Sequence, residues 1–143
     1  MSDSRSQPRA AAHVSVPNDP RALQAVKEEV LAAVSERAYP EAAAFAIRLA
    51  LEEAVQNAYQ HGNQSDPART VGFEWRIAEK SMTVTIEDEG TGFTPGVVPD
   101  PTDPERLEIP SGRGLLLMRA YMTDVQYNDR GNRVTMTYER QAP

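Results

Sequence analysis

Residues 70–89, TVGFEWRIAEKSMTVTIEDE, contain the pattern that decides the fold class. Two runs, 70–78 and 81–89, alternate between apolar and polar positions, and only Glu79 and Lys80 separate them. Alternation of this kind is typical of strands with one buried face, and so short a connection pairs them as an antiparallel hairpin. A doubly wound α/β fold has a regular strand–helix–strand rhythm, which this chain lacks.

A strand and a helix are predicted before this hairpin. The alternation in AHVSVP indicates a short strand around residues 12–16. Asp19 can then act as a helix N-cap, and Pro20 suits the first helical position because the N–H that proline lacks would have no partner there. Apolar residues follow at helical spacing, namely Leu23, Val26, Val30 and Val34.

A second helix is predicted from Pro40 to about His61, with Gly62 placed as a left-handed C-cap. With about 100° of rotation per residue, one apolar stripe of this helix faces the sheet. The stripe consists of Ile47, Leu51, Ala54, Val55 and Ala58. The opposite side is predicted to be solvated, with Arg48, Glu52 and Gln56.

Beyond the hairpin, residues 90–111 hold five prolines and several acids, which is typical of a functional lid or a disordered segment. A helix that begins at the glycines of GRGLLLMRAYM, residues 112–122, is predicted next. A last hairpin, DVQYND followed by NRVTMTYER, turns around Arg130 and Gly131.

The resulting element order, β-α-α-β-β-loop-α-β-β, predicts an α+β fold. We expect a two-layer sandwich with the helices on one face of a mixed, mainly antiparallel sheet. The length of 143 residues suits one domain. Residues 1–11 are polar and rich in alanine and proline, so they are predicted to form a flexible arm, and residues 12–140 to form the single domain.

The composition excludes several classes of function. A net charge of −6 and a pI near 4.9 argue against a direct nucleic-acid partner, which needs a basic surface. The absence of cysteine excludes disulfides and thiolate metal sites. No apolar run approaches the roughly 20 residues that span a bilayer, so no membrane partner is expected and the predicted location is cytoplasmic.

Residues 53–62, EAVQNAYQHG, place a carboxylate and a carboxamide on one arc of the second helix. Glu53 and Asn57 lie one turn apart, flanked by the small residues Ala46 and Ala50. Such a pair suits a hydrated hard cation: Asn57 could supply one oxygen to Mg²⁺ while Glu53 orients or deprotonates a hydroxyl. The alternative is an exposed pair that makes only a weak local contact.

The motif DEGTGF, residues 88–93, follows a strand immediately. Gly90 and Gly92 would let the backbone approach a ligand closely, while Asp88 can accept a hydrogen bond from an exocyclic amine. The alternative is an ordinary turn that ends an edge strand.

A second glycine motif, SGRGL, opens the third helix at Ser111. A phosphate can bind here, because the start of a helix has free N–H groups and the small residues Gly112 and Gly114 let it approach them. Arg113 adds a positive charge, and Leu115 completes the motif. The alternative is that Ser111 simply caps the helix. The three motifs together would enclose one nucleotide: the first would hold its metal, the second its base and the third its phosphates.

These three motifs, EAVQNAYQHG, DEGTGF and PSGRGLLLMRAYMTDV, resemble the N, G1 and G2 boxes of the GHKL ATP-binding superfamily. More narrowly, residues 12–140 are similar to anti-sigma-factor serine kinases of the RsbW and SpoIIAB type. The resemblance implies a Bergerat ATP-binding fold, ATP and Mg²⁺ as cofactors, and phosphorylation of a serine on a STAS-domain anti-sigma factor antagonist. It also implies sequestration of a sigma factor by a homodimer.

Carried over by position, the resemblance makes Glu53 the general base, Asn57 the Mg²⁺ ligand and Asp88 the acceptor for the adenine amine. The glycine motifs would supply the rest of the nucleotide site: Gly90 and Gly92 at the base, and Gly112, Arg113, Gly114 and Leu115 at the phosphates.

The chain departs from the family pattern at one point. Relatives often carry Gly-Thr before the last strand, and here the dipeptide is Gly131-Asn132, which leaves Asn132 and Thr135 as alternatives for that adenine contact. The alternative function is a non-catalytic, ATP-responsive switch that sequesters a regulatory partner.

Overall fold

The computed structural model describes residues 9–90, 118–129 and 131–140. Its elements are β1 (Ala11–Pro17), α1 (Pro20–Glu36), α2 (Glu41–Gln56), the π-helical η2 (Asn57–Gly62), β2 (Thr70–Ile77), β3 (Ser81–Glu87), β4 (Asp124–Tyr127) and β5 (Arg133–Glu139). Residues 118–121 are also helical.

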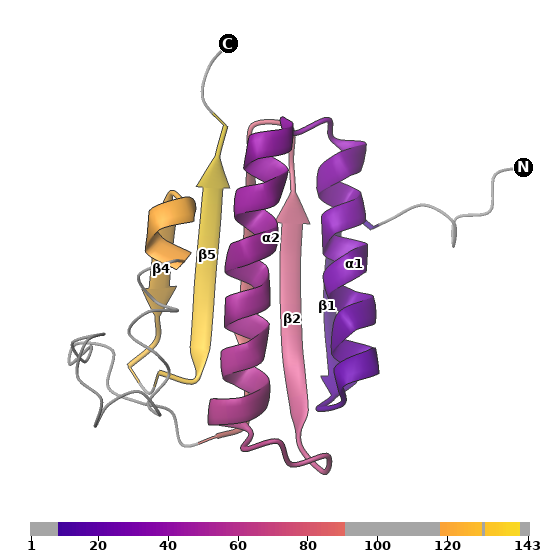
Figure 1. Cartoon of the computed structure of the whole chain (residues 1–143), viewed down its shortest axis with the longest axis vertical. Helices are drawn as coiled ribbons and strands as arrows, with labels where there is room; N and C mark the ends of the chain where they lie inside the picture. The colour runs from indigo at the N-terminus through magenta and orange to yellow at the C-terminus, as the bar shows by residue number, and fades with distance from the viewer. Residues whose placement is uncertain (1–8, 91–117, 130, 141–143) are drawn as a thin grey trace, which may run out of the picture.

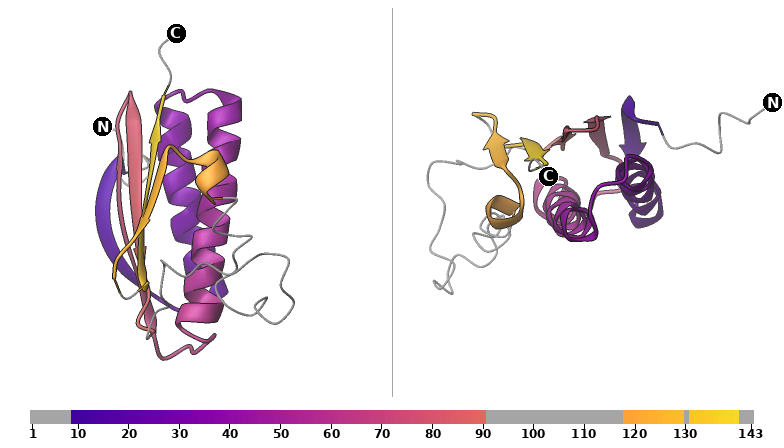
Figure 2. Two further views of the ribbon diagram at one scale, coloured as in Figure 1. Left: turned by 90° about the vertical axis from the view of Figure 1, so that its left-hand side faces the viewer. Right: turned by 90° about the horizontal axis from the view of Figure 1, so that it is seen from above.

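The five strands form one sheet in the order β1-β2-β3-β5-β4, and each neighbouring pair is antiparallel. Both α1 and α2 cover the same face of this sheet (Figures 1 and 2). The predicted α+β two-layer sandwich is therefore confirmed, with antiparallel pairing throughout the described sheet. The predicted hairpin is β2 and β3, closed by a hydrogen bond from Ala78 N to Ser81 O at 2.9 Å.

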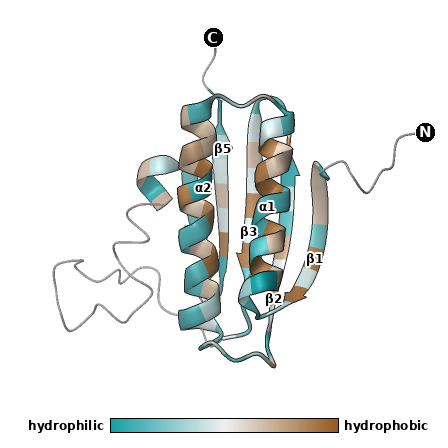
Figure 3. Cartoon of the chain, turned by 45° about the vertical axis from the view of Figure 1, so that its right-hand side comes forward, coloured by the Kyte–Doolittle hydropathy of each residue, from teal (hydrophilic) through white to brown (hydrophobic). Residues whose placement is uncertain are grey.

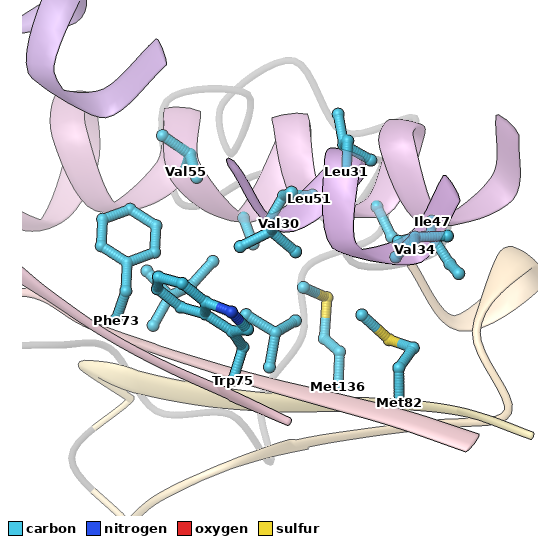
Figure 4. Packing of buried hydrophobic residues seen from close by; sticks show 14 of the residues in the cluster. Val30, Leu31, Val34, Ile47, Leu51, Val55, Phe73, Trp75, Met82 and Met136 are labelled. Atoms are coloured by element: carbon cyan, nitrogen blue, oxygen red, sulfur yellow. The ribbon is translucent and has the colours of Figure 1, made fainter. Parts of the chain in front are cut away.

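The core lies between the two layers because each strand alternates between a buried and a more exposed face. On β2 the buried residues are Val71, Phe73, Trp75 and Ile77. The apolar stripes of both helices point at this face of the sheet, while their polar stripes face outward (Figure 3). Figure 4 shows the resulting packing of aliphatic helix residues against aromatic and methionine side chains of the strands.

The predicted start of α1 is confirmed. Asp19 has extended backbone angles, and its Oδ2 accepts a hydrogen bond from Ala22 N at 3.1 Å, with Pro20 as the first helical residue. The apolar residues predicted to follow at helical spacing are all buried. The predicted sheet-facing stripe of the second helix is likewise buried, over α2 and at Ala58 of η2.

The predicted end of the second helix is wrong in one respect. The helix widens into a π turn over η2, where Asn63 N donates to Ala58 O at 2.8 Å instead of to the carbonyl four residues back. Gly62 is within this turn and does not adopt a positive φ, so it is not a left-handed C-cap. A glycine is needed at this position because a Cβ atom would clash with Asp88.

For residues 9–11 the predicted flexible arm, residues 1–11, is wrong, because the domain holds these residues. Ala11 already pairs in β1, Ala10 O accepts a hydrogen bond from Ile77 N at 2.6 Å, and Arg9 forms an ion pair with Glu29. Residues 1–8 lie outside the described part of the chain, as do residues 91–117, which hold most of the proline-rich segment and the predicted start of the third helix.

None of the helices within the described ranges combines the length and apolar character needed to cross a membrane.

Candidate nucleotide site

A pocket of about 460 Å³, including its open mouth, lies where the end of α2 and η2 face the ends of β3, β4 and β5. Its described lining consists of Ala54, Asn57, Ala58, His61, Gly62, Ile86, Asp88, Tyr127, Gly131, Asn132 and Val134.

The two layers each contribute an apolar wall. Ala54 and Ala58 come from the helical layer, and Ile86 and Val134 come from adjacent strands of the sheet. The small helix side chains leave space between the walls, which suits a flat apolar group such as a nucleotide base. Sequence reasoning expected Ala46 and Ala50 to clear this space, but both are buried, and Ala50 belongs to the core cluster.

Asn57 and His61 give the helical wall its polar side chains. Both lie in η2, the first as its opening residue, and both are half-buried lining residues of the pocket. Single π turns in helices are frequent at functional sites, because they alter the direction of side chains without ending the helix. From η2, Asn57 and His61 both reach the same pocket.

Glu53 lies one turn before Asn57 and is half-buried. It is not among the described residues that line the pocket. Its charge is nevertheless felt there, since it contributes to raising the pKa of Tyr127. The predicted general base is therefore near the pocket, on the helix that forms one wall.

Asp88 lies at the end of β3 in a tight turn. Its Oδ1 accepts a hydrogen bond from Gly90 N at 2.8 Å. A Cβ atom on Gly62 would lie 2.2 Å from Asp88 Cγ, and one on Gly90 would lie 2.0 Å from Gly62 O. The two glycines therefore allow η2 and the Asp88 turn to touch, which places the Asp88 carboxylate in the pocket beside the helical wall.

Two buried asparagines that sequence reasoning missed, Asn18 and Asn63, hold the Asp88 turn against the helical layer. Asn63 Oδ1 accepts a hydrogen bond from Glu89 N at 2.8 Å, and Asn63 Nδ2 donates to Thr70 O at 2.9 Å and to Asn18 Oδ1 at 3.2 Å. Both asparagines are almost fully buried. From the sequence, each reads as an ordinary loop residue, and only their burial reveals the role.

The two candidates for the remaining adenine contact have different positions. Asn132 lines the pocket, but its amide is engaged: Nδ2 donates to Asp88 O at 3.2 Å, and Oδ1 accepts from Asn128 Nδ2 at 2.8 Å. Thr135 lies on the opposite face of the sheet, where its hydroxyl is 3.1 Å from that of Thr85. The structure therefore does not bring Thr135 to the pocket, because residues of a strand alternate between its faces.

Tyr127, at the end of β4, is a lining residue of the pocket that sequence reasoning missed. Burial raises the pKa of its phenol to about 12, opposed by a hydrogen bond with the Asn57 side chain. The charge of Asp88 raises this pKa further, and that of Arg119 lowers it. The phenol therefore stays neutral at physiological pH. A tyrosine in an alternating strand carries no sequence signal that distinguishes it from a core residue.

The other predicted site residues lie outside the described part of the chain. These are Gly92, Gly112, Arg113, Gly114 and Leu115.

The described residues suit a cation with one or two protein ligands better than a metal ion that the protein coordinates fully. No cluster of three or more histidine, aspartate or glutamate side chains with metal-binding geometry occurs among them. Mg²⁺ is commonly held by one or two protein oxygens, with substrate phosphates and water completing its shell. The Asn57 side chain can offer one such oxygen in this pocket.

An antiparallel sheet is covered on one face by helices, and a helix-end asparagine and a strand-end aspartate line one pocket between the layers, which is the arrangement expected of an ATPase domain of the GHKL class. The chain belongs to the histidine kinase-like ATPase domain family, whose model matches residues 16–138.

Several curated relatives are similar to this chain. The anti-sigma F factor of Clostridium perfringens is 32% identical over 96 residues, which cover 63% of this chain and 68% of that protein. The serine-protein kinase RsbW of Listeria innocua is 30% identical over 99 residues, which cover 64% of this chain and 62% of that protein.

A solved structure supports the fold alone. The crystal structure of the RsbU and RsbW domains of Rv1364c from Mycobacterium tuberculosis matches with a TM-score of 0.59 and 17% identity. The match covers 94% of this chain and 32% of that longer chain.

Proposed function

We propose that this protein is an ATP-dependent serine kinase that acts as an anti-sigma factor. It phosphorylates a STAS-domain antagonist and, when that antagonist is absent or phosphorylated, sequesters a sigma factor as a cytoplasmic homodimer. The relatives named as anti-sigma F factor and serine-protein kinase support the proposal. The observation that supports it most is that Asn57 and Asp88, from different layers, line the same pocket.

In this proposal the pocket receives the adenosine end of ATP. The adenine amine donates a hydrogen bond to the Asp88 carboxylate, and the ring lies between the apolar walls formed by Ala54 and Ala58 on one side and Ile86 on the other. The triphosphate then extends past Asn57. Gly92, Gly112, Arg113, Gly114 and Leu115 would enclose the phosphates, and this part of the proposal rests on the family resemblance.

Asn57 would hold Mg²⁺ through its carbonyl oxygen. Two acidic side chains, Asp88 and Glu53, lie in or near the pocket, so a triphosphate would bind there at an electrostatic disadvantage without a cation. When bound, Mg²⁺ supplies charge neutralisation to the phosphates.

Glu53 would act as the general base. The serine oxygen of the antagonist forms a bond to the γ-phosphorus, while the bond from this phosphorus to the β–γ bridging oxygen breaks. The serine proton passes to the Glu53 carboxylate, and ADP leaves.

We therefore expect Glu53→Ala to lower phosphoryl transfer at least about 100-fold, in line with the usual contribution of a general base, while ATP affinity changes by no more than about threefold. The assay follows label from ATP to a purified STAS-domain partner, with calorimetry for affinity. Glu52→Ala is the matched control, because Glu52 is exposed on the neighbouring helix position and contacts only Arg48 among the described ion pairs. Transfer at the native rate by the Glu53 variant would contradict the assignment.

The second candidate function is an ATP-responsive switch that binds its partner without transferring phosphate. The position of Glu53 outside the described lining of the pocket favours it. Under this reading the wild-type protein binds ATP and its partner, but no label reaches the partner serine.

A further inference from the structure

The connection between β4 and β5 carries two asparagines whose side chains are bonded to each other. Asn128 follows the last residue of β4, and Asn132 precedes the first residue of β5. Asn128 Nδ2 donates a hydrogen bond to Asn132 Oδ1 at 2.8 Å. Asn132 lines the candidate nucleotide pocket and is 8% exposed, whereas Asn128 is not among the residues of the described lining. None of the three sequence motifs includes Asn128.

Asn132 holds the backbone of Asp88 by two hydrogen bonds. Its backbone oxygen accepts from Asp88 N at 2.9 Å, and its side-chain Nδ2 donates to Asp88 O at 3.2 Å. The position of the Asp88 carboxylate in the pocket therefore depends on Asn132. A change in the orientation of the Asn132 amide would shift the residue that is proposed to bind adenine.

The orientation of both amides follows from backbone donors. Asn128 Oδ1 accepts from Asn132 N at 3.0 Å and from Arg133 N at 3.1 Å. A backbone N–H group can only donate, so the oxygen of Asn128 has to face these two groups and its NH₂ group has to face Asn132 Oδ1. With its oxygen engaged in this way, Asn132 presents its own NH₂ group to Asp88 O.

We propose that Asn128 and Asn132 are positioning residues for base selectivity: Asn128 orients the Asn132 amide, and Asn132 fixes the Asp88 backbone so that the Asp88 carboxylate meets the exocyclic amine of adenine. The inference rests on the proposed function, in which Asp88 is the adenine acceptor. It assigns part of the preference for a purine with an amine at this position to Asn128, a residue outside the described pocket lining.

The test measures the dissociation constants of ATP and of inosine triphosphate, ITP, by calorimetry in each protein. ITP has a carbonyl oxygen in place of the adenine amine and cannot donate a hydrogen bond there. Both nucleotides have the same triphosphate, so the ratio of the two constants is insensitive to an added charge or to a loss of folded protein. We expect the wild type to bind ATP at least about tenfold more tightly than ITP, the usual effect of a hydrogen bond to a charged group.

Asn128→Asp is the decisive variant. It keeps an oxygen acceptor for the two backbone N–H groups of the turn, as aspartate does in such turns, but it lacks the NH₂ group that orients Asn132. A carboxylate oxygen would attract the Asn132 NH₂ group and turn the Asn132 carbonyl oxygen toward Asp88 O. We expect the preference for ATP over ITP to fall about three- to tenfold, the usual effect of one hydrogen bond.

Two further variants separate this role from a purely structural one. Asn128→Ala loses the backbone contacts as well, so its free energy of unfolding in urea and its preference for ATP should both fall. Gln126→Glu is the matched control, because it adds the same charge on β4 at an exposed position outside the described pocket lining. Its preference for ATP should equal that of the wild type.

A wild-type preference for ATP in Asn128→Asp would overturn the inference, since the turn contacts alone would then suffice. A further fall in the preference when Asn128→Asp is added to Asp88→Ala would also overturn it, because the two asparagines act only through Asp88. A wild type that bound ATP and ITP equally would contradict Asp88 as the adenine acceptor, and one that bound neither would contradict the proposed function. The inference would fail in both cases.

Discussion

Gly62 shows how closely the two walls of the pocket approach each other. Position 62 requires glycine for a steric reason, because a Cβ atom there would clash with the Asp88 carboxylate. The backbone conformation does not require it, since φ at this position is not positive. Asp88 is in turn fixed by Gly90 N and by the Asn132 backbone carbonyl, which accepts from Asp88 N at 2.9 Å. A side chain at position 62 therefore has to displace the residue proposed to bind adenine.

We expect Gly62→Ala to destabilise the fold by about 1–3 kcal/mol, the usual cost of overpacking, and to weaken ATP binding at least about tenfold because Asp88 moves. Urea unfolding and calorimetry measure the two effects. Gly72→Ala is the control, since a Cβ atom there would meet only Glu87 O, at 3.9 Å. That variant should be neutral or slightly more stable. Native ATP affinity in Gly62→Ala would argue against Asp88 as the adenine acceptor.

The end of β5 is joined to the helical layer by one arginine. Arg140 Nη1 donates to Arg37 O at 3.2 Å and to Glu79 O at 3.0 Å, and its Nη2 donates to Ala38 O at 3.2 Å. The guanidinium carbon lies 4.7 Å from the centre of the Tyr39 ring. A single side chain thus ties the last strand to the α1–α2 connection and to the β2–β3 turn.

We expect Arg140→Ala to lower the free energy of unfolding by about 1–2 kcal/mol, because three hydrogen bonds and the ring contact are lost from a partly exposed site. Arg140→Lys should recover less than half of this, since an ammonium group cannot serve several carbonyls and stack on the ring at once. Urea denaturation of the wild type, Arg140→Ala and Arg140→Lys measures these free energies of unfolding. Full recovery by lysine would show that the charge, and not the planar guanidinium, matters.

The layered architecture could be predicted from the sequence because it depends on local patterns: alternation in β2 and β3, the Asp19 cap, and the apolar stripe of α2. Asn57 and Asp88 could also be proposed, since their motifs carry them. The π turn, the Asn18–Asn63 pair and the Tyr127 contact could not. The π turn is a local change of the helix, and the other two depend on side chains from distant segments meeting in the folded chain, which leaves no periodic signal. Thr135 is wrong as an alternative for the adenine contact, because it alternates along β5 with the buried Val134 and Met136 and so lies on the other face of the sheet.

The segment before β1 connects both layers of the molecule. Arg9 forms an ion pair with Glu29 of α1, its guanidinium carbon lies 5.5 Å from the centre of the Trp75 ring of β2, and Trp75 Nε1 donates to Arg9 O at 2.9 Å. The Arg9 hydrogen bond lowers the pKa of the Glu29 carboxyl below its ordinary value of 4.5. Because the folded pKa is the lower one, the pair stabilises the fold above about pH 4.5 and loses this contribution as the pH falls through the folded pKa.

We therefore expect Glu29→Gln to destabilise the protein by about 0.5 kcal/mol at pH 7, a small value because the Arg9 side chain is 53% exposed and solvent screens the pair. The difference from the wild type should shrink as the pH falls from about 4.5 through the folded pKa of Glu29. Trp75 is the only tryptophan, so its fluorescence reports urea unfolding directly. Glu28→Gln is the control, since its contact with Arg48 is longer, at 3.4 Å, and more exposed. A difference that persisted at a pH where Glu29 is protonated in the folded protein would mean that Glu29 contributes through packing, because a protonated carboxyl and an amide are then electrostatically alike.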